Sequence, residues 1–310
     1  MAERPIVTLT LNPALDISSS VEFVTPSDKL RCQSPVFEPG GGGINVSRVC
    51  QRLGEPTLAV VPLGGPTGSR IADLLAAETI EATVIEIGDE TRQSFSIIEE
   101  ATGHQYRFVL PGPTMAADEV ASALSSVVAA ARGAACVVVS GSLPDGVDHD
   151  FVVDLVAAIE DTPVIVDTSG PALVAALHSG AHMVKPSARE LSYVVGRTLL
   201  TEADIEDAAV EVKARSKVDV VVASIGAGGA IAIDDTGTVR LRAPTVQVRS
   251  TVGAGDSMVA GLAVGVSRRC ELIESTALGV AAGTAAVLTD GSKLCEADEV
   301  ERLLPAVVRP

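Results

Sequence analysis

Short apolar strands alternate with amphipathic helices over the last two-thirds of the chain. Four β-branched runs are segments 135–142, 162–169, 181–187 and 218–226. Amphipathic segments such as 149–161 and 202–217 lie between them, and a hairpin pattern at 230–244 precedes two late helix patterns, 255–269 and 275–288. Nearly continuous apolar strands separated by helices are typical of a parallel sheet covered on both faces. The pattern predicts an α/β fold with a doubly wound, mainly parallel sheet.

The first third of the chain has a different pattern. Short segments that partly alternate apolar with polar residues indicate strands at 15–24, 29–40 and 92–112. We interpret these strands, roughly 15–37 and 92–110, as a small β-sheet lid interleaved with the main sheet. The length of 310 residues is compatible with one large domain, and we expect a single domain over 1–310.

The charge and composition exclude several kinds of partner. The chain has 40 acidic and 23 basic residues, a formal net charge of −17 and a sequence pI near 4.6. Because a phosphate backbone would be repelled, nucleic acid is a poor partner. Any anionic ligand needs a local cluster of basic residues. Aromatic residues make up only 2% and Trp is absent, which disfavours stacking platforms for bases or sugars.

The cysteines and the apolar segments indicate a cytoplasmic protein. The five cysteines are scattered and form no CxxC motif, which disfavours zinc sites and disulfide frameworks and fits a reducing cytosol. The first residues lack a basic region followed by an apolar stretch, so no signal peptide is expected. No uncharged apolar run is long enough to cross a bilayer, so we expect no membrane partner.

A glycine turn, "VGAG" at 252–255, precedes a helix pattern, and Asp256 follows it directly. Backbone amides at a helix N-terminus attract anions, and glycines allow close approach, so Gly253, Ala254 and Gly255 suit a phosphoryl group. Asp256 could then take a proton from an attacking hydroxyl. The alternative is an Asp that caps the helix in its first turn.

A second glycine run, 40–43, also ends where a helix pattern begins. It suits close approach of the backbone to a ligand, and Asn45 offers both a donor and an acceptor to hydroxyl groups. The alternative is a flexible loop. The chain contains no GxxxxGK[ST] motif, which excludes a P-loop NTPase, and no GxGxxG after a strand, which disfavours nicotinamide binding.

Together the two motifs, "GINVSR" at 43–48 and "TVGAGDS" at 251–257, resemble those of the ribokinase-like (pfkB) carbohydrate kinases. The resemblance covers essentially the whole chain, and both motifs in this order and spacing are highly specific. Further segments resemble the ATP-dependent 6-phosphofructokinase branch of the family, namely 8–16, 91–97, 105–112, 139–147 and 184–190.

The resemblance implies a catalytic Asp256, with the amides of 252–255 as an anion hole. It implies substrate contacts from Asp16, Gly41, Gly42, Asn45 and Ser142. From the residues alone, Asp16 could equally be a turn residue and Ser142 a loop serine. The phosphate of a phosphosugar needs cations, and Lys29, Arg31, Arg92 and Arg107 lie on the expected lid strands. Their alternative role is charge protection of edge strands.

The resemblance places ATP against a second set of residues. These are Lys185, Ser187, Ser224, Gly226, Gly229 and Thr284. Family members usually carry Asn-x-x-Glu, linked to Mg²⁺, where this chain has Ser187-x-x-Glu190, so the part played by Ser187 is open. Ser-x-x-Glu is also a capping box. A monovalent cation, K⁺ by resemblance, is expected at Ser250, Val252, Ala286, Thr289 and Gly291.

The resemblance implies transfer of the γ-phosphoryl group of Mg-ATP to the 1-hydroxyl of fructose 6-phosphate, giving fructose 1,6-bisphosphate as in glycolysis. Kinases of tagatose 6-phosphate and fructose 1-phosphate are similar relatives and stay open. A non-catalytic regulator that binds nucleotides or sugar phosphates is the alternative of another class, but it would not need the carboxylate of Asp256. The scarcity of aromatic residues disfavours a nucleoside kinase. An exposed lid sheet predicts a homodimer formed through the lid.

Overall fold

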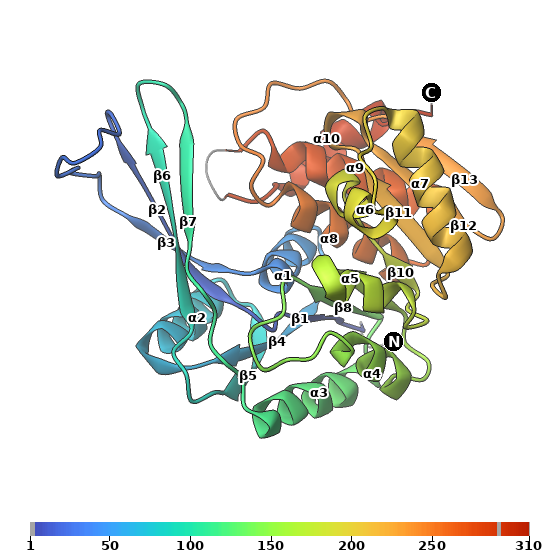
Figure 1. Ribbon diagram of the computed structural model, residues 1–310, viewed down its shortest axis with the longest axis horizontal. Helices are drawn as coiled ribbons and strands as arrows, with labels where there is room; N and C mark the ends of the chain where they lie inside the picture. The colour runs from blue at the N-terminus through green and yellow to red at the C-terminus, as the bar shows by residue number, and fades with distance from the viewer. Residues whose placement is uncertain (1–3, 290–292, 310) are drawn as a thin grey trace.

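A sheet of nine strands runs through the centre of the molecule (Figure 1). The computed structural model describes residues 4–289 and 293–309. The strands are β1 Ile6–Leu9, β4 Thr57–Leu63, β5 Glu81–Glu86, β8 Cys136–Ser140, β9 Val164–Asp167, β10 Met183–Val184, β11 Val220–Ser224, β12 Ala230–Asp234 and β13 Gly237–Leu241. Their spatial order is β13-β12-β11-β10-β9-β8-β1-β4-β5. All neighbours pair in parallel except β11 with β12 and β12 with β13, so the predicted, mainly parallel sheet is confirmed.

Helices cover both faces of this sheet. They are α1 Gly42–Arg52, α2 Gly65–Ala77, α3 Ala117–Ala131, α4 Phe151–Ala158, α5 Gly170–Leu177, α6 Ala188–Val195, α7 Glu202–Arg215, α8 Ala254–Ser267, α9 Leu272–Ala286 and α10 Ala297–Leu303. In residues 4–289 and 293–309, no helix combines the length and the hydropathy needed to cross a membrane.

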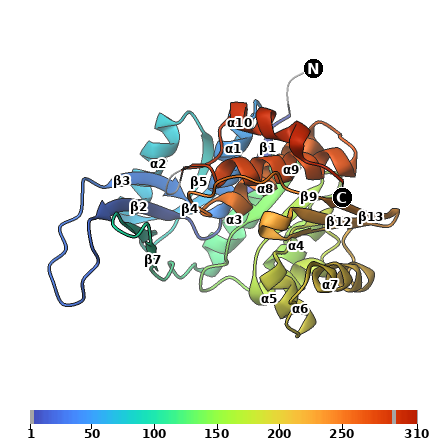
Figure 2. The ribbon, with the colours of Figure 1, turned by 90° about the horizontal axis from the view of Figure 1, so that it is seen from above.

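Alternate side chains of the strands enter two separate hydrophobic clusters. Ile6 of β1 and Val138 of β8 belong to the cluster with α1, α8, α9 and α10. Their neighbours Val7 and Val137 belong to the cluster with α3, α4, α5 and α7. Figure 2 shows the two helical layers on opposite sides of the sheet. Burial on both faces explains why these strands are apolar almost throughout.

A second sheet of four strands stands at one side of the central sheet (Figure 1). In spatial order it contains β3 Val36–Gly40, β2 Ala14–Val21, β6 Arg92–Glu99 and β7 Gln105–Val109. Its central pair, β2 and β6, is parallel, and both outer pairs are antiparallel. Since β2 and β3 precede α1 and β6 and β7 follow β5, the second sheet is interleaved in the chain with the main sheet, as expected.

The predicted strand at 29–40 is wrong over most of its length. Residues 22–35 connect β2 to β3 without strand structure, and Figure 2 shows this loop projecting away from the rest of the molecule. Strand structure begins only at Val36, directly after Pro35, which lacks the N–H that a strand ladder requires. Consequently Lys29 and Arg31 lie exposed on the loop rather than on a strand of the second sheet.

The glycine run 40–43 allows α1 to begin directly against the ends of β1 and β8. Gly41 precedes the helix with φ of 119°, a conformation that residues with a Cβ rarely adopt. A Cβ on Gly43 would lie 2.6 Å from the carbonyl oxygen of Leu9 in β1, and a Cβ on Gly42 would collide with Oγ of Ser140 in β8. The glycines therefore serve a close approach of backbones, which a simple flexible loop would not need.

Candidate active site

The two glycine motifs meet at one hydrogen bond. Asn45, in the first turn of α1, donates from Nδ2 to Oδ2 of Asp256 at 2.8 Å. Asp256 lies in the first turn of α8, after Gly253, which precedes the helix with φ of 74°. Residues that are 211 positions apart in the sequence thus share one point in space.

Burial sets the acid–base behaviour of Asp256. Burial raises the pKa of its carboxyl to about 6, which the hydrogen bond from Asn45 partly opposes. The nearby carboxylate of Asp167 also raises this pKa, whereas Lys185 lowers it. Asp256 is therefore ionised at neutral pH, with a pKa close enough to neutrality for a proton acceptor.

The start of α8 leaves room for an anion. The first bond within the helix runs from the amide of Ser257 to the carbonyl of Gly253 at 2.8 Å, so the amides of Ala254 and Gly255 have no partner within the helix. A Cβ on Gly255 would meet no atom within 4 Å, so the space above this turn is open. The amide of Val252 differs from expectation, because it donates to Oγ of Ser250 at 3.2 Å.

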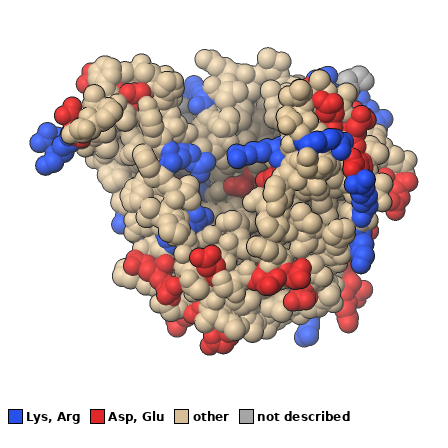
Figure 3. All heavy atoms as spheres, viewed as in Figure 1, with Lys and Arg blue, Asp and Glu red and all other residues tan. Residues whose placement is uncertain are grey.

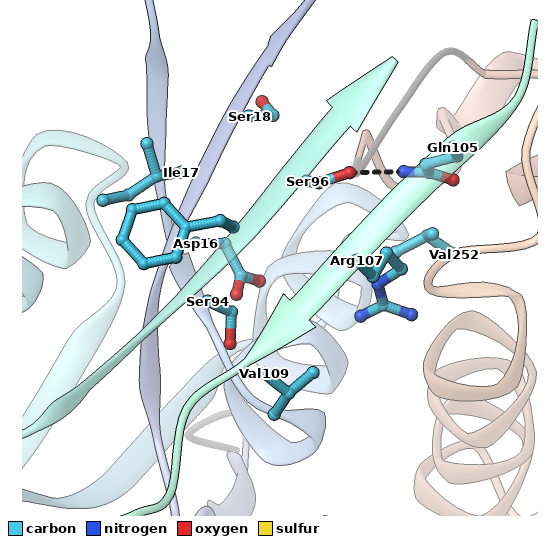
Figure 4. Close-up of a pocket in the computed structure, with 10 residues that line it drawn as sticks. Asp16, Ile17, Ser18, Ser94, Ser96, Gln105, Arg107, Val109 and Val252 are labelled. Atoms are coloured by element: carbon cyan, nitrogen blue, oxygen red, sulfur yellow. Dashed lines mark hydrogen bonds between the residues drawn. The ribbon is translucent and has the colours of Figure 1, made fainter. Parts of the chain in front are cut away.

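A pocket beneath the second sheet reaches Val252, just before the turn that carries Asp256. Figure 4 shows the carboxylate of Asp16 on β2 and the guanidinium of Arg107 on β7 projecting into the same space, with Val252 across from them. Burial raises the pKa of Asp16 to about 6, while Arg107 and Arg92 act to lower it. Basic side chains surround the hollow between the second sheet and the rest of the molecule (Figure 3).

Arg92 and Ser142, both expected to contact the substrate, are brought together. Arg92, at the start of β6, donates from Nη2 to the carbonyl oxygen of Asn12 at 3.0 Å, and Asn12 donates from Nδ2 to Oγ of Ser142 at 3.1 Å. Arg92 and Ser142 are thus linked to each other through Asn12. Lys29 and Arg31 are not part of this group, because they lie on the outer loop 22–35.

A second cavity, of about 370 Å³, lies at the start of α8, where Ala254 and Gly255 line it. Its lining includes four residues expected at the nucleotide, Ser224, Gly226, Gly229 and Thr284. Apolar side chains such as Val246 and Met258 form other parts of its wall. The cavity also contains Ala254 and Gly255, so a ligand in it would reach the open amides of α8.

Lys185 forms an ion pair with Asp167. Its Nζ lies 3.0 Å from Oδ1 of Asp167 at the end of β9, where Lys185 is buried and the side chain of Asp167 is 14% exposed. Burial acts to lower the pKa of Lys185, but the ion pair with Asp167 outweighs it and raises that pKa above its ordinary value. Lys185 therefore stays charged and brings a buried cation close to Asp256.

Ser187 and Glu190 form the capping box of α6. The amide of Ser187 donates to Oε2 of Glu190 at 2.7 Å, and Oγ of Ser187 accepts from the amide of Glu190 at 3.3 Å. Within the part of the chain that the structure describes, no group of three or more His, Cys, Asp or Glu residues is arranged to hold a metal ion.

Two loops meet beside the start of α8, where a monovalent cation was expected. The amides of Arg249 and Ser250 donate to the carbonyl of Val287 at 2.8 and 3.4 Å, which brings Ser250 next to the end of α9. The amide of Val252 is bonded to Oγ of Ser250. There, Oγ1 of Thr289 donates to the carbonyl of Ala286 at 2.8 Å. Gly291, the fifth expected residue, lies outside the described residues.

Comparison with known proteins identifies the family. A family profile described as "pfkB family carbohydrate kinase" matches residues 9–299. The chain belongs to this family. It is 45% identical to ATP-dependent 6-phosphofructokinase isozyme 2 of Mycobacterium tuberculosis strain H37Rv, over 98% of this chain and 90% of the relative. It is 42% identical to the isozyme 2 of Escherichia coli K12, over 96% and 97% of the two chains.

Solved structures agree with this pfkB assignment. Phosphofructokinase-2 from E. coli in complex with potassium superposes with a TM-score of 0.93 at 40% identity, covering 98% of this chain and 99% of that one. Its complex with fructose 6-phosphate gives a TM-score of 0.91 at the same identity and coverage. A further structure of the E. coli protein is described as its tetrameric inhibited form. The ribokinase-like fold is therefore confirmed.

Sequence reasoning on this pfkB member missed Asp167 and Asn12. Asp167 ends a buried strand, "VIVD", at the same edge of the sheet as Lys185. Its position at the end of an apolar strand could have indicated a residue of the site. Asn12 lies in the connection between β1 and β2, and only the folded chain places it between Arg92 and Ser142.

We expect Asp256→Asn to stabilise the protein at neutral pH. A carboxyl with a folded pKa of about 6, against 3.8 ordinarily, destabilises the native state once ionised. The two pKa values differ by about two units, or ~3 kcal/mol, which solvent in the cleft reduces to about 1–2 kcal/mol. Below about pH 4 both states are protonated, so the gain appears as pH rises through about 4–6 and persists above it.

Urea unfolding followed by circular dichroism at pH 4 and pH 8 measures this gain. Glu160→Gln, which removes the same charge from an exposed position, is the control and should change stability by less than about 0.5 kcal/mol. An Asp256→Asn protein that is less stable than wild type at pH 8 would show that the ionised carboxylate does not destabilise the native state.

Proposed function

We propose that the chain is an ATP-dependent 6-phosphofructokinase. The observation that carries the proposal is the position of Asp256 in the first turn of α8. Val252, just before this turn, lines the pocket of Asp16 and Arg107, while Ala254 and Gly255 line the cavity that leads to the open helix amides. Membership of the pfkB family and the names of the relatives support this assignment. The acceptor is the 1-hydroxyl of fructose 6-phosphate, and the product is fructose 1,6-bisphosphate.

In this proposal the residues around Asp256 divide into three tasks. Asp16, Asn45 and the backbone of Gly41 and Gly42 hold the sugar hydroxyl groups. Arg92, Arg107 and Ser142 hold the phosphate that the substrate already carries, because arginine forks and a hydroxyl suit its oxygens. Ser224, Gly226, Gly229 and Thr284 line the cavity for ATP.

The transfer is an in-line displacement at the γ-phosphorus of ATP. Asp256 accepts the proton of the 1-hydroxyl while that oxygen forms its bond to phosphorus. The bond between phosphorus and the bridging oxygen of ADP breaks, and ADP leaves. The amides of Gly253, Ala254 and Gly255 stabilise negative charge on the transferred group, and Lys185 adds a fixed positive charge nearby.

The residues also suit the metal ions that such a reaction uses. One Glu190 oxygen accepts from Ser187, so the other can hold a water of Mg²⁺, which prefers a few oxygen ligands together with phosphates. Bound there, Mg²⁺ would neutralise charge on the ATP phosphates. Hydroxyl and carbonyl oxygens at Ser250, Val252, Ala286 and Thr289 are the ligand type that K⁺ takes.

We also infer that two copies pair through their second sheets, each of which serves as a lid. Phe23, Val36, Phe108 and Val109 on this sheet and its loop are each more than half exposed, although they are large and apolar. Only in such a pair could Lys29 and Arg31 approach a substrate. Light scattering should give a mass of twice 31.6 kDa at micromolar concentration. A monomer would contradict this inference, and a tetramer would show that a further interface exists.

The substrate is tested by ADP production with Mg-ATP and K⁺ against a panel of acceptors. The panel contains fructose 6-phosphate, tagatose 6-phosphate, fructose 1-phosphate, ribose and adenosine. We expect fructose 6-phosphate to give the highest kcat/KM, and free ribose to be at least about 100-fold worse because it leaves the phosphate-binding arginines unpaired. A preference for another phosphosugar would show that the proposed substrate is wrong and would leave the proposed mechanism unchanged. No turnover with any acceptor would favour a binding protein.

A further inference from the structure

Asn12 connects Arg92 and Ser142, two of the residues to which the proposed function assigns the phosphate of the substrate. It lies between β1 and β2, and its side-chain Nδ2 donates to Oγ of Ser142 at 3.1 Å. Its main-chain carbonyl accepts from Nη2 of Arg92 at 3.0 Å. Its Oδ1 is buried against Gly112 and has no hydrogen-bond partner among the residues that the structure describes. Three distant segments of the chain are therefore held by one residue.

The direction of the bond from Asn12 determines what Ser142 can do. An amide nitrogen only donates, so Oγ of Ser142 is the acceptor in this bond. A serine hydroxyl has one hydrogen, and that hydrogen is left to point elsewhere. Since Ser142 is exposed at the cleft, its hydroxyl is available as a donor to an anionic ligand.

The bond from Arg92 fixes a second donor in the same way. The carbonyl of Asn12 takes one N–H of Nη2, which sets the position of the guanidinium plane. Arginine carries five N–H donors, so others remain for a phosphate. A side chain that is already held in its binding position loses less conformational entropy when it binds a ligand.

We propose that Asn12 is a positioning residue for the phosphate group of the phosphosugar. Its amide orients the Ser142 hydroxyl, and its carbonyl holds the Arg92 guanidinium, so both present donors to the same group. This inference rests on the proposed function. Because Asn12 acts through Ser142 and not on Asp256, its loss affects binding of the phosphosugar more than the transfer step.

Steady-state kinetics of four variants test the proposal. With fructose 6-phosphate varied at saturating Mg-ATP, Asn12→Ala should raise KM for the sugar about 5–20-fold, with kcat and the KM for ATP within about 2-fold of wild type. Asn12→Asp should raise this KM further, because a carboxylate accepts the Ser142 hydrogen and repels a phosphate. The double variant Asn12→Ala with Ser142→Ala should be no worse than Ser142→Ala alone.

Several outcomes would overturn the proposal. An unchanged KM in Asn12→Ala would do so, as would additive effects of the two alanine substitutions or a KM for ATP that rises equally. Asn12→Asp keeps the shape of the side chain, so it decides the question if Asn12→Ala does not fold. A wild-type enzyme that turns over no phosphosugar overturns the proposed function and this inference together. An active wild type with an unaffected Asn12→Ala variant overturns only the inference.

Discussion

The hydrogen bond between Asn45 and Asp256 depends on how closely α1 can approach the central sheet. The two helices lie in the same layer, and each begins at a glycine turn with a positive φ. A Cβ at Gly43 would push α1 away from β1, and Asn45 would move with it. The open amides of α8, the carboxylate of Asp256 and the first turn of α1 therefore occupy one place because a few glycines remove steric obstacles.

Charge is the second constraint, because an acidic chain is proposed to bind two anionic substrates. The net charge of −17 is offset locally by Arg92 and Arg107 on the second sheet and by the buried Lys185. Two buried carboxyls, those of Asp16 and Asp256, have pKa values raised to about 6. Burying ionisable groups costs stability, and such costs are typical of sites that perform chemistry.

Local patterns in the sequence predicted much of this arrangement. The strands buried on both faces are apolar in the sequence, and both glycine motifs require a particular backbone geometry. The sheet and the glycine turns before α1 and α8 were therefore predictable. The loop 22–35 was not, because its apolar and basic residues suggested a strand from residue 29, whereas the strand begins only after Pro35. The Lys185–Asp167 pair and the role of Asn12 depend on the neighbours that strands acquire only in the folded sheet. The capping box of Ser187 was visible in the sequence, but its relation to Mg²⁺ is not decided by local pattern.

The central claim is that Asp256 removes a proton and does not hold the substrate in place. The most direct test compares kcat and fructose 6-phosphate affinity, measured by calorimetry, in wild type and Asp256→Asn. The amide keeps the shape of the side chain and can still accept the hydrogen bond from Asn45. We predict that kcat falls by about 10²–10⁴-fold while the Kd for fructose 6-phosphate changes by less than about 3-fold. A kcat loss below about 10-fold, or a Kd that weakens in proportion to kcat, would contradict the claim.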